Sequence, residues 1–222
     1  MKIDVLYEDN HLIAVFKSAG VLTQGDKTGD ENLMDEVKKY LKEKYQKTGN
    51  VFLGLLHRLD RPVSGIILFA KTSKGASRLS EQFRNHSVVK IYHAVVLGKP
   101  LQSEGTLTNY LVKDEKNKKA IIVKDNEAKV AELDYEVVAS NDKYSLLKVQ
   151  LKTGRFHQIR AQLANTGCPL LGDLKYGAPF AFPESRIALC ANFLSFETAT
   201  TKEQINLSIP LPKEWEEYLR QA

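Results

Sequence analysis

The sequence has little cysteine: Cys168 and Cys190 are the two thiols among 222 residues. They form no Cys-x-x-Cys pair and show no metal-ligand spacing, so neither a disulfide framework nor a structural zinc is expected. The first residues, Met-Lys-Ile-Asp, carry charge where a signal peptide needs an apolar run. No segment is long and apolar enough to span a bilayer. These absences predict a cytoplasmic protein with reduced thiols.

Repeats, low-complexity tracts and linkers rich in proline, glycine or serine are absent as well. With 43% hydrophobic residues, the chain can bury one sizeable core, and we expect a single domain over residues 1–222. The formal net charge is +5. A basic chain can bind a polyanion, but its charge alone does not establish that it does.

The spacing of hydrophobic residues predicts more strands than helices. Apolar residues recur every fourth position from Leu33 to Tyr45, which predicts an amphipathic helix with Asp30 as its N-cap and Gly49 as its stop. Further helices are expected from Thr72 or Ser73, over residues 156–165 and near Trp215. Strands are expected over residues 3–8, 12–16, 66–70, 88–97, 130–139, 144–152, 187–193 and 205–209. The charged run at residues 113–119 is interpreted as a solvated turn.

These elements favour one fold class. Strands outnumber helices and often follow one another directly, which is typical of an α+β fold. We therefore expect a mixed, largely antiparallel sheet with flanking helices rather than a doubly wound parallel sheet.

The first segment with chemical potential is His-Arg-Leu-Asp-Arg-Pro-Val-Ser-Gly at residues 57–65. It places one carboxylate, Asp60, between two short apolar runs, where charges are costly unless they are paired or used. From composition alone, a surface turn in which Asp60 bonds its own backbone or pairs with Arg61 explains the segment better. The functional alternative is a carboxylate held rigidly at the rim of a sheet.

The second segment is Lys-Ile-Tyr-His-Ala-Val at residues 90–95. Alternation places Tyr92 on the same face of a strand as Ala94 and Val96, the inner face. An ordinary core tyrosine is the simpler interpretation of this position.

The third segment is Thr-Gly-Arg-Phe-His-Gln-Ile-Arg at residues 153–160. On a helix, Phe156 and Ile159 lie on one apolar stripe, and His157 and Arg160 share the adjacent face. An isolated His-x-x-Arg pair of this kind would be interpreted as a solvated basic face.

Together and in this order, the three segments resemble the RluA-type pseudouridine synthases. The signature of that family is His-Arg-Leu-Asp-x-x-x-Ser-Gly, then a Lys-x-Tyr strand, then a Gly-Arg-x-His-Gln-Ile-Arg helix. The likeness extends to residues 9–20, near the family's Lys-Pro-x-Gly loop, and to residues 169–176, near its Pro-Leu-x-Gly-Asp-x-x-Tyr segment. The sequence departs from the family pattern at Ser18, Val63 and Cys190, where proline, threonine and histidine are common. These departures affect the choice of subfamily.

The resemblance implies an enzyme that isomerises specific uridines in structured ribosomal or transfer RNA to pseudouridine. It implies that Asp60 is the nucleophile, that Arg160 is its partner and that Tyr92 lies against the uracil ring. The reaction involves neither redox change nor phosphate transfer, so we expect no cofactor and no metal. The family often has an N-terminal RNA-binding domain of the S4 type, and we expect no such separate domain here.

The resemblance also implies base flipping, because a uridine inside folded RNA is inaccessible until it is extruded. Arg58 would fill the space that the base leaves. We expect structured RNA as the partner of a monomer, with no membrane and no obligate protein partner. The other candidates for RNA contact are His57, Arg61, Lys17, Arg84, Arg155 and His157.

Three other functions would require features that the segments do not favour. A noncatalytic RNA-binding module would tolerate the loss of Asp60, Tyr92 or Arg160, and all three are present. A hydrolase with paired carboxylates, such as a nucleosidase, needs a second acid or base near Asp60. A metal-dependent nuclease needs a cluster of acidic or histidine ligands. The segments supply arginine and tyrosine instead.

Overall fold

The computed structural model describes residues 2–125, 128–182 and 186–220. The chain forms two compact units, the first comprising Met1–Val89 and Phe193–Ile209, and the second Lys90–Asn192 and Pro210–Ala222. The chain therefore leaves the first unit after Val89 and returns to it at Phe193. The single domain over residues 1–222 stays a prediction.

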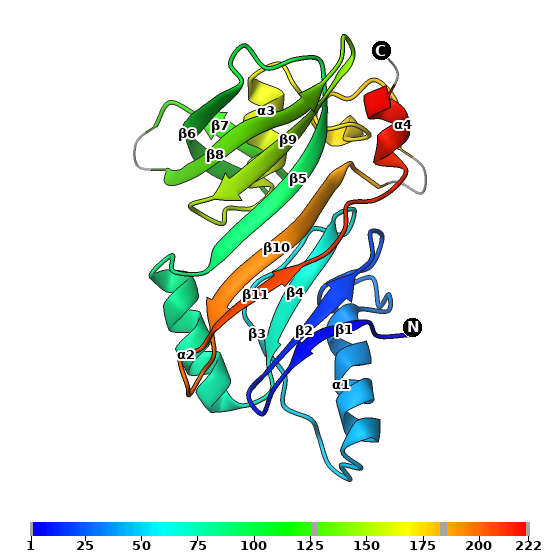
Figure 1. The fold of residues 1–222 in the computed structure, drawn as a ribbon, viewed down its shortest axis with the longest axis vertical. Helices are drawn as coiled ribbons and strands as arrows, with labels where there is room; N and C mark the ends of the chain where they lie inside the picture. Colours follow the sequence, from blue (N-terminus) through cyan, green and yellow to red (C-terminus); the bar gives the residue numbers. More distant parts are fainter. Residues whose placement is uncertain (1, 126–127, 183–185, 221–222) are drawn as a thin grey trace. The chain divides into compact units, whose positions relative to one another are not determined.

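Antiparallel strands with two helices make up the described part of the first unit (Figure 1). Its elements are β1 (Val5–Glu8), β2 (Leu12–Lys17), α1 (Leu33–Lys44), β3 (Gly54–Leu55), β4 (Ser64–Ala70), α2 (Ser73–Arg84), the second half of β10 (Leu189–Glu197) and β11 (Gln204–Ser208). Strand β2 pairs with both β1 and β4. The register places Lys17 opposite Gly65, so the end of β2 meets the start of β4.

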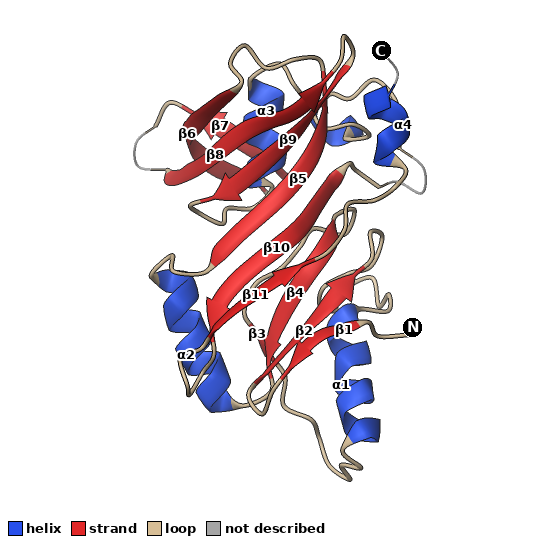
Figure 2. Ribbon diagram, viewed as in Figure 1, coloured by secondary structure: helices blue, strands red, loops and turns tan. Residues whose placement is uncertain are grey.

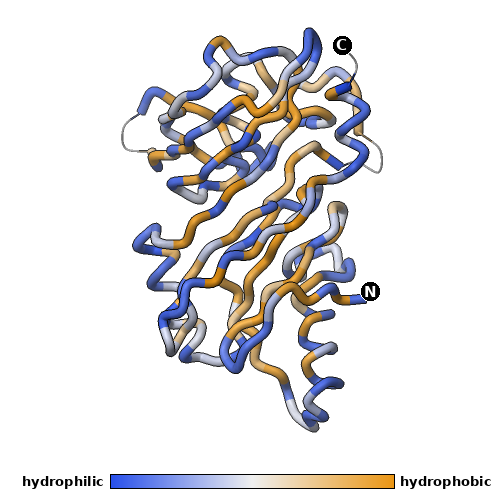
Figure 3. Tube along the Cα trace, viewed as in Figure 1, coloured by the Kyte–Doolittle hydropathy of each residue, from blue (hydrophilic) through white to orange (hydrophobic). Residues whose placement is uncertain are grey.

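The core of the first unit comes from β2, β4, β10 and α2. Figure 3 shows hydrophobic residues concentrated along these strands, whereas α1 alternates between hydrophobic and hydrophilic residues. Burial of each leucine, isoleucine, valine or phenylalanine side chain contributes about 1.5–3 kcal/mol, so this cluster stabilises the unit. Its buried members are Leu12, Ala14, Ile66, Leu68, Ala70, Leu79, Val88, Leu194, Phe196 and Ala199.

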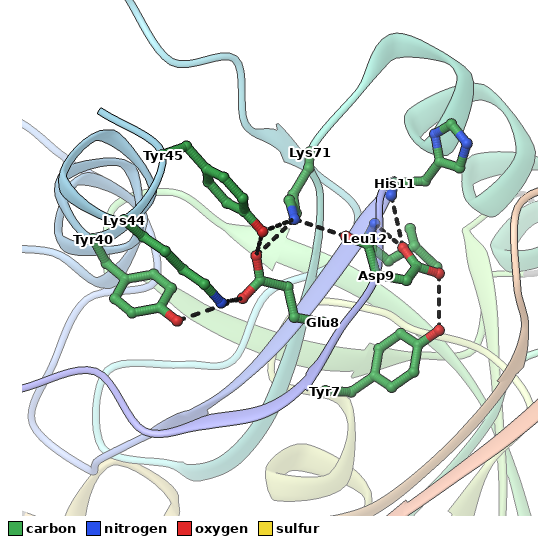
Figure 4. Close-up of polar contacts among 9 residues, drawn as sticks. All are labelled: Tyr7, Glu8, Asp9, His11, Leu12, Tyr40, Lys44, Tyr45 and Lys71. Atoms are coloured by element: carbon green, nitrogen blue, oxygen red, sulfur yellow. Dashed lines mark hydrogen bonds and ion pairs between the residues drawn. The ribbon is translucent and has the colours of Figure 1, made fainter. Parts of the chain in front are cut away.

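A half-buried carboxylate links α1 to the strands (Figure 4). Glu8 at the end of β1 accepts hydrogen bonds from Lys44 at 2.7 Å, Lys71 at 2.6 Å and the Tyr45 hydroxyl at 2.6 Å. Burial acts to raise the pKa of Glu8, but the hydrogen bonds from Lys44, Lys71 and Tyr45 outweigh it and hold that pKa at about 2. The carboxylate therefore stays charged at neutral pH, and it links the C-terminal end of α1 to β1 and to the segment after β4.

The boundaries of the helices in the first unit differ partly from the predictions. Helix α2 begins at Ser73, as expected, and Thr72 is its N-cap, because the Thr72 side chain accepts from the Gly75 N–H. The N-cap of α1 is Asn32 and not Asp30, since the Asn32 side chain accepts from the Asp35 N–H. This helix ends at Lys44, before the predicted stop at Gly49.

The second unit is a sheet with strand order β5-β9-β8-β6-β7 (Figure 2). Its described elements are β5 (Val89–Leu97), β6 (Glu104–Asp114), β7 (Lys119–Val123), β8 (Lys129–Ser140), β9 (Tyr144–Leu151), α3 (Gln158–Asn165), the 3-10 helix η1 (Leu174–Tyr176), the first half of β10 and α4 (Trp215–Arg220). All neighbouring strands in this order are antiparallel. A small core of Leu111, Ala120, Ala131 and Ala161 joins α3 to β6, β7 and β8.

The fold class is confirmed: the chain is α+β with a largely antiparallel sheet. The charged run at residues 113–119 contains the turn between β6 and β7, as predicted. Strands β6 and β7 themselves were not predicted. Helix α3 begins at Gln158 and not at Phe156, because the Gln158 side chain accepts from the Arg155 N–H at 2.9 Å and His157 has a left-handed backbone. Among the described residues, no helix is long and apolar enough to cross a membrane.

Candidate active site

Asp60 lies in a tight turn that leads into β4. Its carbonyl oxygen accepts from the Val63 N–H at 3.0 Å, which closes the turn over residues 60–63. Leu59 and Val63 are buried on either side, whereas Asp60 is half-buried. The buried neighbours hold the backbone on both sides of the carboxylate.

Thr23 fixes the backbone immediately before Asp60. Its hydroxyl donates to the Leu59 carbonyl at 2.9 Å and accepts from the Leu59 N–H at 3.2 Å. Thr23 is itself buried, so these bonds are shielded from water. Sequence reasoning missed this residue, because a threonine in a glycine-rich loop carries no signal of a partner 36 residues away.

Lys17 supports the same turn from the end of β2. Its ammonium donates to the carbonyls of Val21 at 2.7 Å, Ser18 at 3.1 Å and Arg61 at 3.2 Å. Burial lowers the pKa of Lys17 to about 7, and the nearby Asp60 carboxylate acts in the opposite direction. The side chain has no exposed surface. In this structure Lys17 stabilises the Asp60 turn, and its predicted contact with an RNA phosphate stays a prediction.

Two arginines flank Asp60. Arg61 donates to the Gly20 carbonyl at 2.9 Å and to the Asp30 carboxylate at 2.8 Å, while the Gly20 N–H donates back to the Arg61 carbonyl at 2.7 Å. Arg61 thus joins the loop after β2 to the turn. Arg58 is exposed, as a residue that enters RNA must be, and its role stays a prediction.

His57 begins the motif in a partly buried position. Its Nε2 accepts from the Leu68 N–H at 3.0 Å, and its ring stacks on Phe83 at a centroid distance of 5.0 Å. These contacts give His57 a structural role in the first unit. Its predicted contact with RNA stays a prediction.

Tyr92 lies in β5 of the second unit, opposite Val149 of β9. It is buried with 8% of its surface exposed, and Ala94 and Val96 are buried as well, which confirms the predicted inner face. The next residue, His93, is joined through Nδ1 to the Asn192 side chain at 2.7 Å.

Arg160 is buried in α3, so the solvated basic face is excluded for this residue. Its Nε donates to Asp173 Oδ2 at 2.7 Å and its Nη2 to Asp173 Oδ1 at 2.8 Å. This is the bidentate geometry that best fits a guanidinium to a carboxylate. Asp173 has 1% exposure and no predicted role, although it lies within the resembling segment 169–176. The proximity of Arg160 to Asp60 stays a prediction.

His157 occupies the position before α3. Its Nε2 lies 3.0 Å from Arg160 Nη1, and its Nδ1 lies 2.9 Å from the Tyr176 hydroxyl. Burial and, to a smaller extent, the adjacent Arg160 guanidinium lower the pKa of the imidazole to about 3. His157 is therefore neutral at physiological pH and half-buried. Its predicted contact with RNA stays a prediction.

The remaining candidates, Arg84 and Arg155, are exposed. Arg84 lies in the last turn of α2. Arg155 donates through Nε to the Val130 carbonyl at 2.8 Å, which holds its side chain beside β8. Both remain available to a phosphate. Within the described ranges, no group of three or more histidine, cysteine, aspartate or glutamate residues is arranged to hold a metal ion.

Several of the predicted residues therefore belong to two clusters, each of which also contains one residue that was not predicted. In the first unit, Lys17, Thr23 and Arg61 hold the turn that carries Asp60. In the second unit, His157 and Asp173 surround Arg160.

Comparison with known proteins identifies the family. Residues 11–165 match the RNA pseudouridylate synthase family, and this match covers more than half of the chain. The chain belongs to this family. It is therefore an RNA pseudouridine synthase, an isomerase that converts uridine in RNA to pseudouridine.

Relatives of this synthase align over most of its length. It is 35% identical over 238 residues to an uncharacterised RNA pseudouridine synthase of Chlorobaculum parvum, with 96% of this chain and 72% of that protein covered. It is 33% identical over 211 residues to ribosomal large subunit pseudouridine synthase C of Rickettsia prowazekii, with 94% and 68% covered. The solved structure of human RNA pseudouridylate synthase domain containing 4 matches with a TM-score of 0.79 at 26% identity, covering 96% of this synthase and 90% of that chain.

Proposed function

We propose that this synthase isomerises uridine in large-subunit ribosomal RNA, with Asp60 as its nucleophile. The observation that carries the assignment of Asp60 is the restraint of its turn by Thr23 and Lys17. A nucleophile must be held in near-attack geometry, and a rigid turn provides that placement. Asp60 is also the carboxylate of the strongest resembling segment.

The reaction rearranges bonds within one nucleotide. The N1–C1′ bond breaks, uracil turns, and C5 bonds to C1′; C5 loses a proton and N1 gains one, so the composition is unchanged. Asp60 traps the ribose or the uracil intermediate covalently. Tyr92 stacks on the uracil through its ring, and its hydroxyl assists the movement of the proton from C5. Arg160 supplies positive charge for the Asp60 carboxylate.

The uridine reaches Asp60 by leaving its stack in the RNA. Arg58, which is exposed and precedes Asp60 by two residues, occupies the vacated space. Arg61, Arg84 and Arg155 contact phosphates, which position the RNA without reading its sequence. We propose that the enzyme acts as a cytoplasmic monomer without an obligate protein partner.

The proposed substrate class, large-subunit rRNA, rests on the name of the Rickettsia relative. The following experiment tests it directly. Purified enzyme is incubated with transcripts of large-subunit rRNA, small-subunit rRNA and tRNA, and pseudouridine is mapped by carbodiimide modification and primer extension. We expect modification in the large-subunit transcript and none in the other two. Deletion of the gene should remove the same pseudouridines from cellular rRNA. Modification of tRNA alone would contradict the proposed substrate.

The different placements of Lys17 and Arg84 predict opposite effects of their replacement. Lys17→Met removes a donor from three backbone carbonyls, of which the Arg61 carbonyl keeps its bond from the Gly20 N–H, and it should lower the free energy of unfolding by about 1–3 kcal/mol. It should leave the salt dependence of RNA binding unchanged. Arg84→Gln should leave stability unchanged and reduce the slope of log K against log salt by about 1, because one phosphate contact is lost.

Urea denaturation and filter binding at several salt concentrations measure the two effects of this pair. If Lys17→Met reduces the slope of log K against log salt and leaves stability unchanged, Lys17 contacts a phosphate after all. An unchanged slope in Arg84→Gln would remove Arg84 from the RNA surface.

A further inference from the structure

Asp173, which precedes the short helix η1, and Tyr176, the last residue of η1, both contact the surroundings of Arg160. Asp173 contacts the guanidinium directly, whereas Tyr176 reaches it through His157. Asp173 and His157 are not part of the small hydrophobic core that joins α3 to the sheet, whereas the Tyr176 side chain also packs against that core.

The hydrogen-bond directions in this network are fixed by chemistry. An arginine can only donate, so His157 Nε2 must accept from Arg160. Nε2 therefore carries no proton, and in the neutral imidazole the proton lies on Nδ1, which donates to the Tyr176 hydroxyl. That hydroxyl also accepts from the Ala120 N–H at 2.7 Å. Arg160 thus sets the His157 tautomer, and Tyr176, held by strand β7, accepts from the Nδ1–H of that tautomer.

The same contacts restrict the rotation of the guanidinium. Asp173 engages Nε and Nη2, and His157 engages Nη1, so three of its five N–H groups have fixed directions. The ring of Tyr176 also lies 5.1 Å from the guanidinium carbon. The Arg160 side chain is hydrogen-bonded on both sides of its guanidinium. It has therefore lost its rotamer freedom before a substrate binds.

The backbone supports the same arrangement. His157 adopts a left-handed conformation with φ of +50°, which is uncommon for a residue other than glycine. Its ring stacks on Phe156 at a centroid distance of 3.8 Å. Gly172, the residue before Asp173, has φ of +84°, and a Cβ there would lie 2.4 Å from Phe182 Cβ. The chain on both sides of the Arg160 fork is thus held in conformations that few residues tolerate.

We propose that Asp173, together with the His157–Tyr176 pair, positions the Arg160 guanidinium for the isomerisation step. These are positioning residues: they set the rate of the chemical step through Arg160 and leave the affinity for RNA unchanged. The inference rests on the proposed role of Arg160 in catalysis. It adds two residues, Asp173 and Tyr176, and a defined His157 tautomer to the site.

A double-mutant cycle tests this inference. Asp173→Asn keeps the shape of the side chain and removes its charge, Tyr176→Phe removes one hydroxyl, and Arg160→Lys keeps a charge without the planar fork. Each of the first two changes is made in the wild-type and in the Arg160→Lys background. The single-turnover rate at saturating enzyme, the Kd for RNA and the melting temperature are measured for all variants.

We expect Asp173→Asn to slow single turnover by about 10- to 30-fold and Tyr176→Phe by about 3- to 5-fold, with the Kd for RNA unchanged within about twofold. In the Arg160→Lys background, neither change should slow the reaction further by more than about twofold, because the group that they position is gone. Glu8→Gln is the matched control. It removes the charge of a half-buried carboxylate that pairs with Lys44 and Lys71, so it should lower the melting temperature without changing the rate.

Other outcomes overturn the inference. If the effects of Asp173→Asn and Arg160→Lys multiply, Asp173 acts independently of Arg160. A wild-type rate in both Asp173→Asn and Tyr176→Phe would show that the network does not serve catalysis. If Asp173→Asn does not fold, Tyr176→Phe decides through the same cycle. Failure of the proposed function is distinct, because it appears as a wild-type rate in Arg160→Lys alone.

Discussion

Replacement of Asp60 by asparagine is expected to reduce pseudouridine formation by about four orders of magnitude or more, the scale on which enzymes lose activity without their nucleophile. The amide has almost the shape of the carboxylate but cannot form the covalent intermediate. The turn should persist, because its hydrogen bond uses the Asp60 backbone carbonyl. The affinity for RNA and the melting temperature should therefore change little.

The measurement is tritium release from C5-labelled uridine in the RNA, under single-turnover conditions. Asp30→Asn is the matched control, since Asp30 is an exposed carboxylate that pairs with Arg61 near the same turn. It should retain activity within about twofold, because exposed ion pairs contribute little. Substantial turnover by purified Asp60→Asn would remove Asp60 from the role of nucleophile.

Arg58→Ala should slow the enzyme strongly on a stem-loop and weakly on an RNA whose target uridine is already unpaired. Extrusion of a stacked base costs a few kcal/mol, and about 1.4 kcal/mol corresponds to a factor of ten. Loss of the side chain that replaces the base should therefore slow single turnover by about 100-fold on the paired substrate. On the unpaired substrate, less stacking must be replaced, and a few-fold effect is expected.

Arg160→Ala provides the comparison for Arg58→Ala. It removes the group proposed to act on Asp60, so it should slow both substrates by the same factor. The two variants are measured on both RNAs at saturating enzyme. An equal loss on the paired and unpaired RNAs with Arg58→Ala would make Arg58 a phosphate contact and end the extrusion hypothesis.

Short-range patterns in the sequence predicted the elements that depend on local physics. Alternation of polar and apolar residues located β5 and the β8–β9 hairpin, because one face of each strand is buried. Strand β6 was not predicted. In this strand, Thr106 and Thr108 alternate with Leu107 and Asn109. Its outward positions are polar and its neighbouring turn is highly charged, so the hydrophobic signal is weak.

The candidate site was predictable only where a motif lies within one segment. The segment around Asp60 and the pair His157 and Arg160 are recognisable in the sequence. Thr23 reaches Leu59 across 36 residues and Lys17 reaches Arg61 across 44. Such pairs are brought together by the register of β2 and β4, which no local pattern encodes. The burial of Lys17 likewise depends on that register. The charge of Lys17 suggested a contact with RNA, but the side chain is surrounded by protein.

The path of the chain through the first unit bears on how the protein folds during synthesis. The core of that unit needs Leu194 and Phe196, yet the whole segment Lys90–Asn192 of the second unit is made before them. At ordinary rates of translation, strands β2 and β4 wait on the order of ten seconds for the β10–β11 hairpin that completes their core. Their apolar faces are exposed in the meantime. A nascent chain arrested before Phe193 should therefore be a better chaperone substrate than one released after Ile209.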